Sequence, residues 1–138
     1  MHHPWRIFRA LGDSWKLRWA DLPEGILGMT DHLKREVTLT VGMTQAERRC
    51  TIAHETQHIL RGHVCGETTR REERIVDGTV AWLLLDDIRK IADEMVWHRC
   101  DLEQVADALW VDEETLRVRL MNLHPAERHY LSRRLAED

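Results

Sequence analysis

Two histidines and a glutamate in this sequence have the spacing of a catalytic zinc site. They are His54, Glu55 and His58, which form an HExxH motif. Residues four positions apart lie on one face of a helix, so both imidazoles can reach a single zinc ion. Glu55 follows the first histidine, where its carboxylate can take a proton from an attacking water and pass it to a leaving amine. The motif predicts zinc-dependent hydrolysis.

A catalytic zinc ion needs a third protein ligand, and the residues after the motif offer several. Glu72 is expected to be occupied in capping the next helix. Asp77 follows Glu73 by one helical turn, where its carboxylate either orients a ligating histidine or is a solvated acid. The candidates for the third ligand are His63, Cys65, Glu67, Glu72, Glu73 and Asp77.

Two predicted helices would position these side chains. A capping box at Thr44 and Glu47 predicts a helix that carries the HExxH motif and ends before Gly62. A second helix is predicted from Thr69 to about His98. The chain can therefore turn back after the motif and present acidic residues to the two histidines.

Gly78 interrupts the second predicted helix, which costs helix stability relative to alanine. A residue without a side chain would let this helix pack closely against the HExxH helix. The other interpretation is a tolerated imperfection without a packing role. The sequence favours neither.

The segment before the motif has the alternating pattern of strands. We predict a short helix at Pro4–Leu11 and strands at 15–19, Ile26–Thr30 and Glu36–Val41. Strands followed by helices predict an α+β fold, with a small antiparallel sheet packed on the HExxH helix and on the helix that follows it. The strand Glu36–Val41 is the candidate edge for pairing with an extended substrate.

Three further helices are predicted after residue 98. Their first turns are marked by Asp101, Asp112 and Pro125. We expect residues 1–98 to form a zincin-like core and residues 99–138 to form a helical tail that packs on it within one domain.

The tail resembles a helix-turn-helix motif from Val105 to Leu120. The second helix of that motif begins with Asp112, Glu113 and Glu114, and three acids there oppose contact with phosphates. We therefore predict a packing or substrate-docking role for the tail, with DNA binding as the less favoured alternative.

Composition fits a folded globular chain of 138 residues, since 43% of them are apolar and 32% are charged. A net charge of -4 does not attract the chain to DNA or to anionic membranes. We find no signal peptide and no apolar run of membrane-spanning length, and expect a cytoplasmic protein. The six tryptophans are expected in the core. Cys50, Cys65 and Cys100 are expected to be reduced thiols, with Cys65 as a minor candidate for a metal ligand.

The segment from Thr44 to Leu85 resembles the ImmA/IrrE family of gluzincin-like zinc metallopeptidases. In that family a helix with a Glu-x-x-Ala-Asn/Asp pattern follows the HExxH helix, and a small, aromatic and leucine-rich stretch comes next. The run from Glu73 to Leu84 has this pattern, with Val76 where alanine is usual. The glutamate of the pattern is the family's third zinc ligand, so the resemblance assigns that role to Glu73.

The resemblance implies a function as well as a ligand. Members of the family are often encoded by phages and mobile elements, and they usually cut a repressor-type regulator to release a genetic switch. We therefore expect a zinc-dependent endopeptidase with a protein substrate. Thr79 and Asp86 replace the family's usual phenylalanine and proline, which leaves the ligands intact and the specificity pocket undefined.

Two other functions remain open from the sequence. The chain could be a metal-stabilised regulator without catalysis that binds a repressor or DNA through its C-terminal helices. It could also be a zinc hydrolase that acts on a small molecule, although an extended strand suits a peptide better. A donor that stabilises the transition state is also expected near the metal. The candidates for it are His98, His124, His129 and Tyr130.

Overall fold

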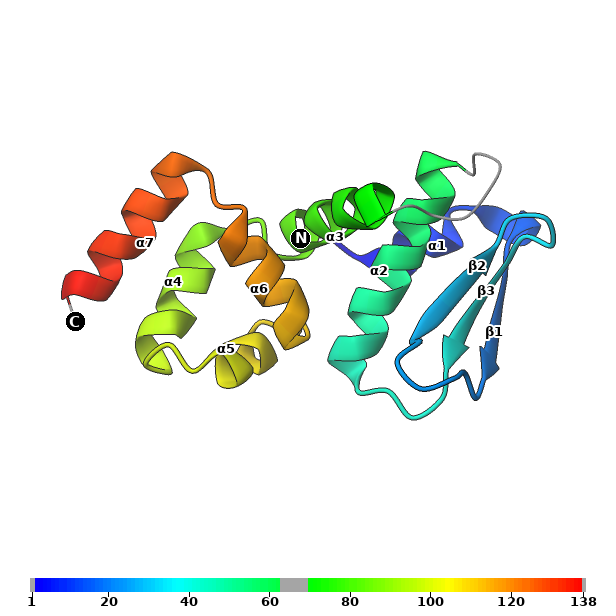
Figure 1. Cartoon of the computed structure of the whole chain (residues 1–138), viewed down its shortest axis with the longest axis horizontal. Coiled ribbons are helices and arrows are strands. Elements are labelled where there is room, and N and C mark those ends of the chain that lie inside the picture. Colours follow the sequence, from blue (N-terminus) through cyan, green and yellow to red (C-terminus); the bar gives the residue numbers. More distant parts are fainter. Residues whose placement is uncertain (1, 63–69, 138) are drawn as a thin grey trace.

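The computed structural model describes residues 2–62 and 70–137, and this part of the chain confirms the α+β prediction. A small sheet with α1 and α2 lies at one end of the molecule, α4 to α7 lie at the other, and α3 lies between them (Figure 1). The elements are α1 (Pro4–Arg9), a 3-10 turn (Gly12–Ser14), β1 (Lys16–Ala20), β2 (Gly28–Asp31), β3 (Glu36–Thr40), α2 (Gln45–Arg61), α3 (Arg70–Leu84), α4 (Ile88–Trp97), α5 (Leu102–Ala108), α6 (Glu113–Met121) and α7 (Pro125–Glu137).

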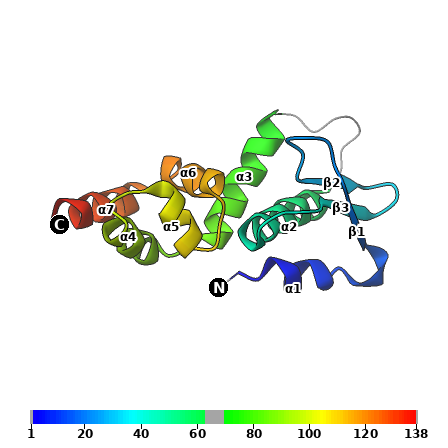
Figure 2. The same ribbon diagram turned by 90° about the horizontal axis from the view of Figure 1, so that it is seen from below.

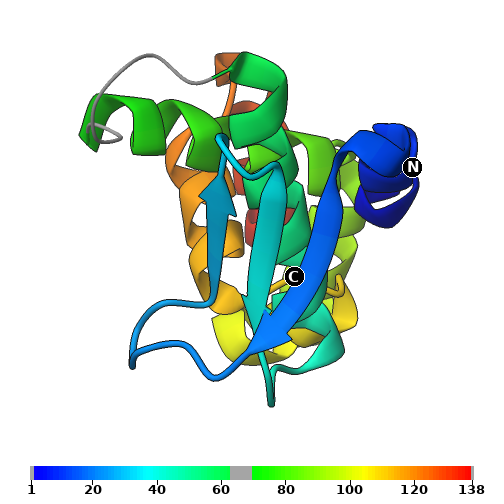
Figure 3. The same ribbon diagram turned by 90° about the vertical axis from the view of Figure 1, so that its right-hand side faces the viewer.

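The three strands form a mixed sheet in the order β1-β3-β2 (Figure 3). β1 pairs with β3 in parallel, while β2 pairs with β3 in antiparallel fashion. The prediction of an antiparallel sheet was therefore wrong, as was the prediction that Glu36–Val41 is an edge strand. Val37 and Leu39 are fully buried, and a strand with such residues gains most from a central position with a partner on each side. β1 and β2 form the two edges.

Helix α2 is the central element, because it packs on both sides. Its residue Ile52 joins Phe8, Val37 and Leu39 in an apolar cluster under the sheet. Its residues Cys50 and Ala53 belong to a second cluster, shared with α3 to α7. The expected helix ends are confirmed: Thr44 and Glu47 form the capping box, and Gly62 ends the helix with a φ of 80°. His54, Glu55 and His58 therefore lie on a helix that is held from two sides.

The single long helix predicted from Thr69 to His98 was wrong, because the structure has α3 and α4 separated by residues 85–87. Asp87 begins α4 by accepting a hydrogen bond from the backbone N–H of Arg89 at 2.9 Å. The carbonyl oxygen of Leu85, which a continuous helix would use internally, accepts a 2.7 Å hydrogen bond from Nε of Arg119. A local cap and a buried side chain from α6 thus both support the break.

Gly78 lies in α3 with open space around it, since an added Cβ would meet no atom within 4 Å. The close-packing interpretation of Gly78 was therefore wrong. The structure favours a tolerated imperfection.

The expected starts of the last three helices at Asp101, Asp112 and Pro125 are confirmed. Viewed from below, α6 lies beside α3, on which it packs, and α5, α4 and α7 lie beyond α3 on the same side (Figure 2). The turn between α5 and α6 contains Trp110 with a φ of 61°, and its carbonyl oxygen accepts a 3.0 Å hydrogen bond from Nη1 of Arg49 on α2. This contact ties the turn to the HExxH helix.

Four tryptophans are exposed, against the expectation that all six are in the core. They are Trp19, Trp82, Trp97 and Trp110. Among the helices that the structure describes, none combines the length and apolar character needed to cross a membrane.

Candidate metal centre

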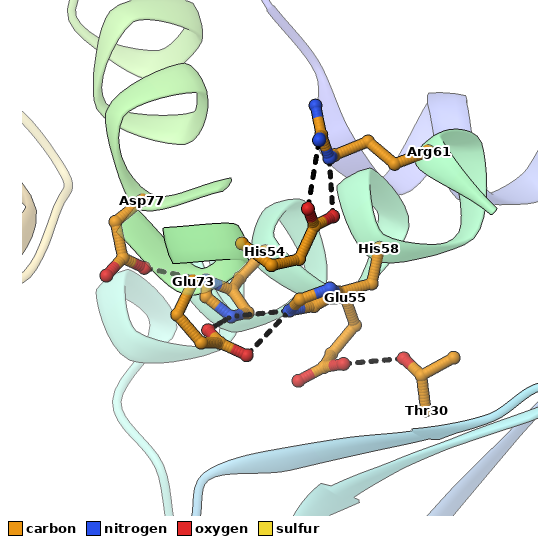
Figure 4. A network of polar contacts seen from close by, with 8 residues as sticks. Thr30, His54, Glu55, His58, Arg61, Glu73 and Asp77 are labelled. Carbon is orange, nitrogen blue, oxygen red and sulfur yellow. Dashed lines mark hydrogen bonds and ion pairs between the residues drawn. The ribbon is translucent and has the colours of Figure 1, made fainter. Parts of the chain in front are cut away.

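Three side chains from α2 and α3 point their donor atoms at one another (Figure 4). Nε2 of His54 lies 3.1 Å from Nε2 of His58. The carboxylate oxygens of Glu73 lie 2.9 Å from Nε2 of His54 and 3.1 Å from Nε2 of His58. These three residues are the only group in the described part of the chain whose donors converge as metal ligands do.

The spacing of these donors fits a tetrahedral zinc ion. Ligands about 2.1 Å from zinc in tetrahedral geometry lie about 3.4 Å from one another. The distances between the donors are 2.9 to 3.1 Å, so a small outward movement of each side chain would make room for the ion. Two histidines and one carboxylate are also a common ligand set for catalytic zinc, with the fourth position left for water or substrate.

Asp77 holds the first histidine of the motif. Its Oδ1 lies 3.0 Å from Nδ1 of His54, so the opposite ring nitrogen faces the other donors. Burial disfavours a charged imidazole at His54, but the hydrogen bond to Asp77 and the charges of Glu55 and Glu73 outweigh burial and raise the pKa of His54. The surroundings of this histidine therefore favour a positive charge, from a proton or from a metal ion.

Glu55 lies under the histidines and is 6% exposed. Thr30 of β2 donates a 2.5 Å hydrogen bond from Oγ1 to Oε2 of Glu55 (Figure 4). The Glu55 carboxylate lines the same pocket as His54 and Glu73. Strand and helix touch closely here, because a Cβ added to Gly28 would lie 2.7 Å from Cγ2 of Thr51 and 3.2 Å from Glu55. The close approach of β2 fixes the place of the carboxylate.

Two of the three donor residues, His54 and Glu73, line a pocket of about 380 Å³. Residues 25–28 form its wall on the sheet side, and Val80 of α3 also contributes to it. The tail contributes as well, through Asp112, Glu114, Thr115 and Val118 at and after the start of α6. The pocket is thus a joint product of the sheet, the HExxH helix, α3 and the tail.

The other candidates for the third ligand have different places. Both carboxylate oxygens of Glu72 bind Arg61, with Oε1 2.5 Å from Nε and Oε2 2.9 Å from Nη2. Thr69, the expected partner of Glu72 in a capping box, lies outside the described residues, as do His63, Cys65 and Glu67.

The remaining cysteines and the candidate donors do not join the converging group. Cys50 lines the pocket, but burial raises the pKa of its thiol to about 11, so the thiol stays protonated at neutral pH. Cys100 is exposed. The four candidates for a transition-state donor, His98, His124, His129 and Tyr130, do not line this pocket.

Sequence reasoning missed Thr30, Gly28 and the pocket residues of α6. A glycine inside a strand is a known sign of close backbone approach, so Gly28 carried a usable signal. Thr30 and Glu114 carried none, because their roles depend on contacts with residues far along the chain. Comparisons with protein-family models, with curated proteins and with solved structures found no match to this chain.

Proposed function

We propose that this protein is a zinc-dependent endopeptidase that cuts a repressor-type regulatory protein. The observation that carries the proposal is the convergence of the donor atoms of His54, His58 and Glu73 beside the buried carboxylate of Glu55. The resemblance of this segment to the ImmA/IrrE family supplies the substrate class.

Each residue of the site has a distinct task in this proposal. His54, His58 and Glu73 would hold the ion, and Asp77 would keep the ring of His54 turned toward it. Zinc bound there supplies polarisation of the scissile carbonyl and acidifies the attacking water. Glu55 takes a proton from that water and returns it to the leaving amine, while Thr30 holds the carboxylate through its other oxygen.

The corrected strand order supports a different pairing strand for the proposed substrate. β2 is an edge strand, it contacts α2, and residues 26–28 line the pocket. An extended peptide paired with β2 would pass beside Glu55, whereas β3 has strands on both sides and offers no free edge. We therefore move the proposed pairing strand from Glu36–Val41 to Gly28–Asp31.

The first test is the metal content of the purified protein, measured by elemental analysis. We expect about one zinc per chain for the wild type, in line with a single site. His58→Ala and Glu73→Ala should each lose most of it, whereas Glu72→Gln should retain it because both oxygens of Glu72 are engaged by Arg61. A wild type that takes up no zinc when zinc is supplied would overturn the proposal.

The second test separates catalysis from binding. The zinc-loaded protein should cut a repressor-type regulator encoded beside its gene at one site, and a chelator should stop the reaction. Glu55→Gln should lower the rate by at least about 100-fold, because it removes the general base. A regulator without catalysis would instead work equally well with Glu55→Gln, and cleavage of small esters alone would favour a small-molecule hydrolase.

The structure weakens the DNA-binding alternative. In a helix-turn-helix reader the N-terminal end of the second helix faces the bases. Here that end is the start of α6, where Asp112 and Glu114 line the pocket of the candidate metal centre. Three consecutive acids, Asp112 to Glu114, also repel phosphate.

A further inference from the structure

The tail forms one wall of the pocket at the candidate metal centre. α6 lies on the other side of α2 from β2 (Figure 1), so a peptide on β2 would face α6 across the pocket. Val118 and Thr115 of α6 line this wall beside Val80 of α3. Glu114 lines it one residue before Thr115, in the first turn of the helix.

The described lining of the pocket contains five carboxylates and no lysine or arginine. Four of the carboxylates already have a partner: two hold His54, one is held by Thr30, and one caps α6 through the backbone N–H of Thr115. The fifth belongs to Glu114, for which residues 2–62 and 70–137 supply no hydrogen bond or ion pair. The carboxylates are Glu55, Glu73, Asp77, Asp112 and Glu114.

The neighbours of Glu114 indicate what kind of group it would bind. Val80 is buried, Val118 is half-buried and Glu114 is exposed, and all three line the pocket. The wall therefore combines apolar surface with one unpaired negative charge at its exposed side. Arginine and lysine side chains match such a surface, because their aliphatic stems pack on apolar groups while the charged head stays at a polar rim. A carboxylate in a substrate would be repelled by the same wall.

We propose that Glu114 is a specificity-determining residue, which selects arginine or lysine next to the scissile bond of the substrate. This inference rests on the proposed peptidase function, since the candidate ligands His54 and Glu73 and the proposed base Glu55 line the same pocket. It also gives the tail a role in substrate choice beyond packing.

The test uses two dipeptide hydroxamates that bind zinc through the same chelating group. One carries arginine beside the hydroxamate and the other carries citrulline, which has nearly the same shape without the charge. We expect the zinc-loaded full-length protein to bind the arginine compound about fivefold more tightly in calorimetric titrations, as for a partly exposed ion pair. The preference should shrink as salt is added.

Glu114→Gln should remove this preference and leave zinc content and citrulline binding unchanged. The matched control is Glu113→Gln, since Glu113 is adjacent, pairs with Arg117 at 3.5 Å and does not line the pocket. This control should keep the preference. Equal binding of both compounds by the wild type, or a preference that survives Glu114→Gln, would overturn the inference and leave the peptidase proposal standing. A chain that binds no zinc would overturn both.

Discussion

The hydrogen bond from Thr30 to Glu55 joins a surface strand to a nearly buried carboxylate. Replacement of Thr30 by valine keeps the shape of the side chain and removes the donor, so Oε2 of Glu55 loses its partner. A buried acceptor without a partner costs about 1–2 kcal/mol. We expect Thr30→Val to lower the free energy of unfolding by that amount in chemical denaturation of the metal-free protein.

Thr30→Ser is the control, because it keeps the hydroxyl group and should recover most of the loss. Equal losses for the serine and valine variants would contradict a dominant contribution from the hydrogen bond, because serine keeps the hydroxyl group. In the peptidase assay, Thr30→Val should also lower kcat more than it raises KM, since Thr30 acts by holding Glu55.

At the residue scale, the side chains that could be predicted were those whose positions follow from local spacing. The HExxH motif places two histidines on one helical face whatever the rest of the fold does. Glu73 was one of several acids within reach, and it was the family resemblance that selected it. Thr30 and Glu114 were beyond prediction, because one depends on how β2 meets α2 and the other on how α6 meets α3.

At the scale of one helix, Gly78 offers a direct test of the α3 structure. The position is helical, and a Cβ there would meet open space. Gly78→Ala should therefore raise the free energy of unfolding by about 0.5–1 kcal/mol, because alanine loses less backbone freedom on folding. Zinc content should not change.

Gly62 is the contrasting glycine for this experiment. It ends α2 with a φ of 80°, which an L-residue adopts only with strain. Gly62→Ala should lower the free energy of unfolding by about 1 kcal/mol. Thermal and chemical denaturation of both variants would show whether the two glycines differ in sign.

Elements with local signals were the ones predicted well. α2 has a capping box at one end and a glycine at the other, and α5 to α7 have clear first-turn residues. The α3–α4 break was missed although Asp87 offered a local N-cap signal. The second contact at the break joins residues 34 apart, Arg119 and Leu85, and carried no local signal. The strand order was also missed, because it depends on contacts between strands that are not adjacent in sequence. β1 pairs with β3 in parallel, and β2 lies on the outer side of β3.

At the scale of the whole molecule, one ion pair joins three segments. Arg119 is 1% exposed, and its Nη1 and Nη2 donate hydrogen bonds of 2.9 and 2.6 Å to Glu127 of α7, while its Nε binds the α3–α4 link. Glu127→Gln would leave this buried guanidinium without its counter-charge. We expect a loss of about 3 kcal/mol in the free energy of unfolding. Glu137→Gln, in an exposed pair with Arg133, should cost less than about 0.5 kcal/mol.

The same pair predicts a pH dependence. The hydrogen bond from Arg119 holds the pKa of Glu127 below its ordinary value near 4.5. The backbone N–H of His124 and the charges of Arg119 and His124 act in the same direction. The stabilisation is therefore complete above that value and is lost as the pH falls through the lower pKa of the folded protein. As the pH falls from about 5 through the lowered pKa of Glu127, the wild type should lose more stability than Glu127→Gln. Parallel curves for the two proteins would contradict this assignment.

The shared pocket wall has a consequence for how such a chain can change over evolution. A recombination event could exchange residues 99–138 for another helical segment. It would replace four residues of the pocket lining together, namely Asp112, Glu114, Thr115 and Val118. It would also remove Val111, Leu116 and Leu131 from the apolar cluster that includes α2 and α3. The tail is therefore not exchangeable as a separate unit, and changes in the pocket wall should arise through point mutations in α6 more readily than through domain shuffling.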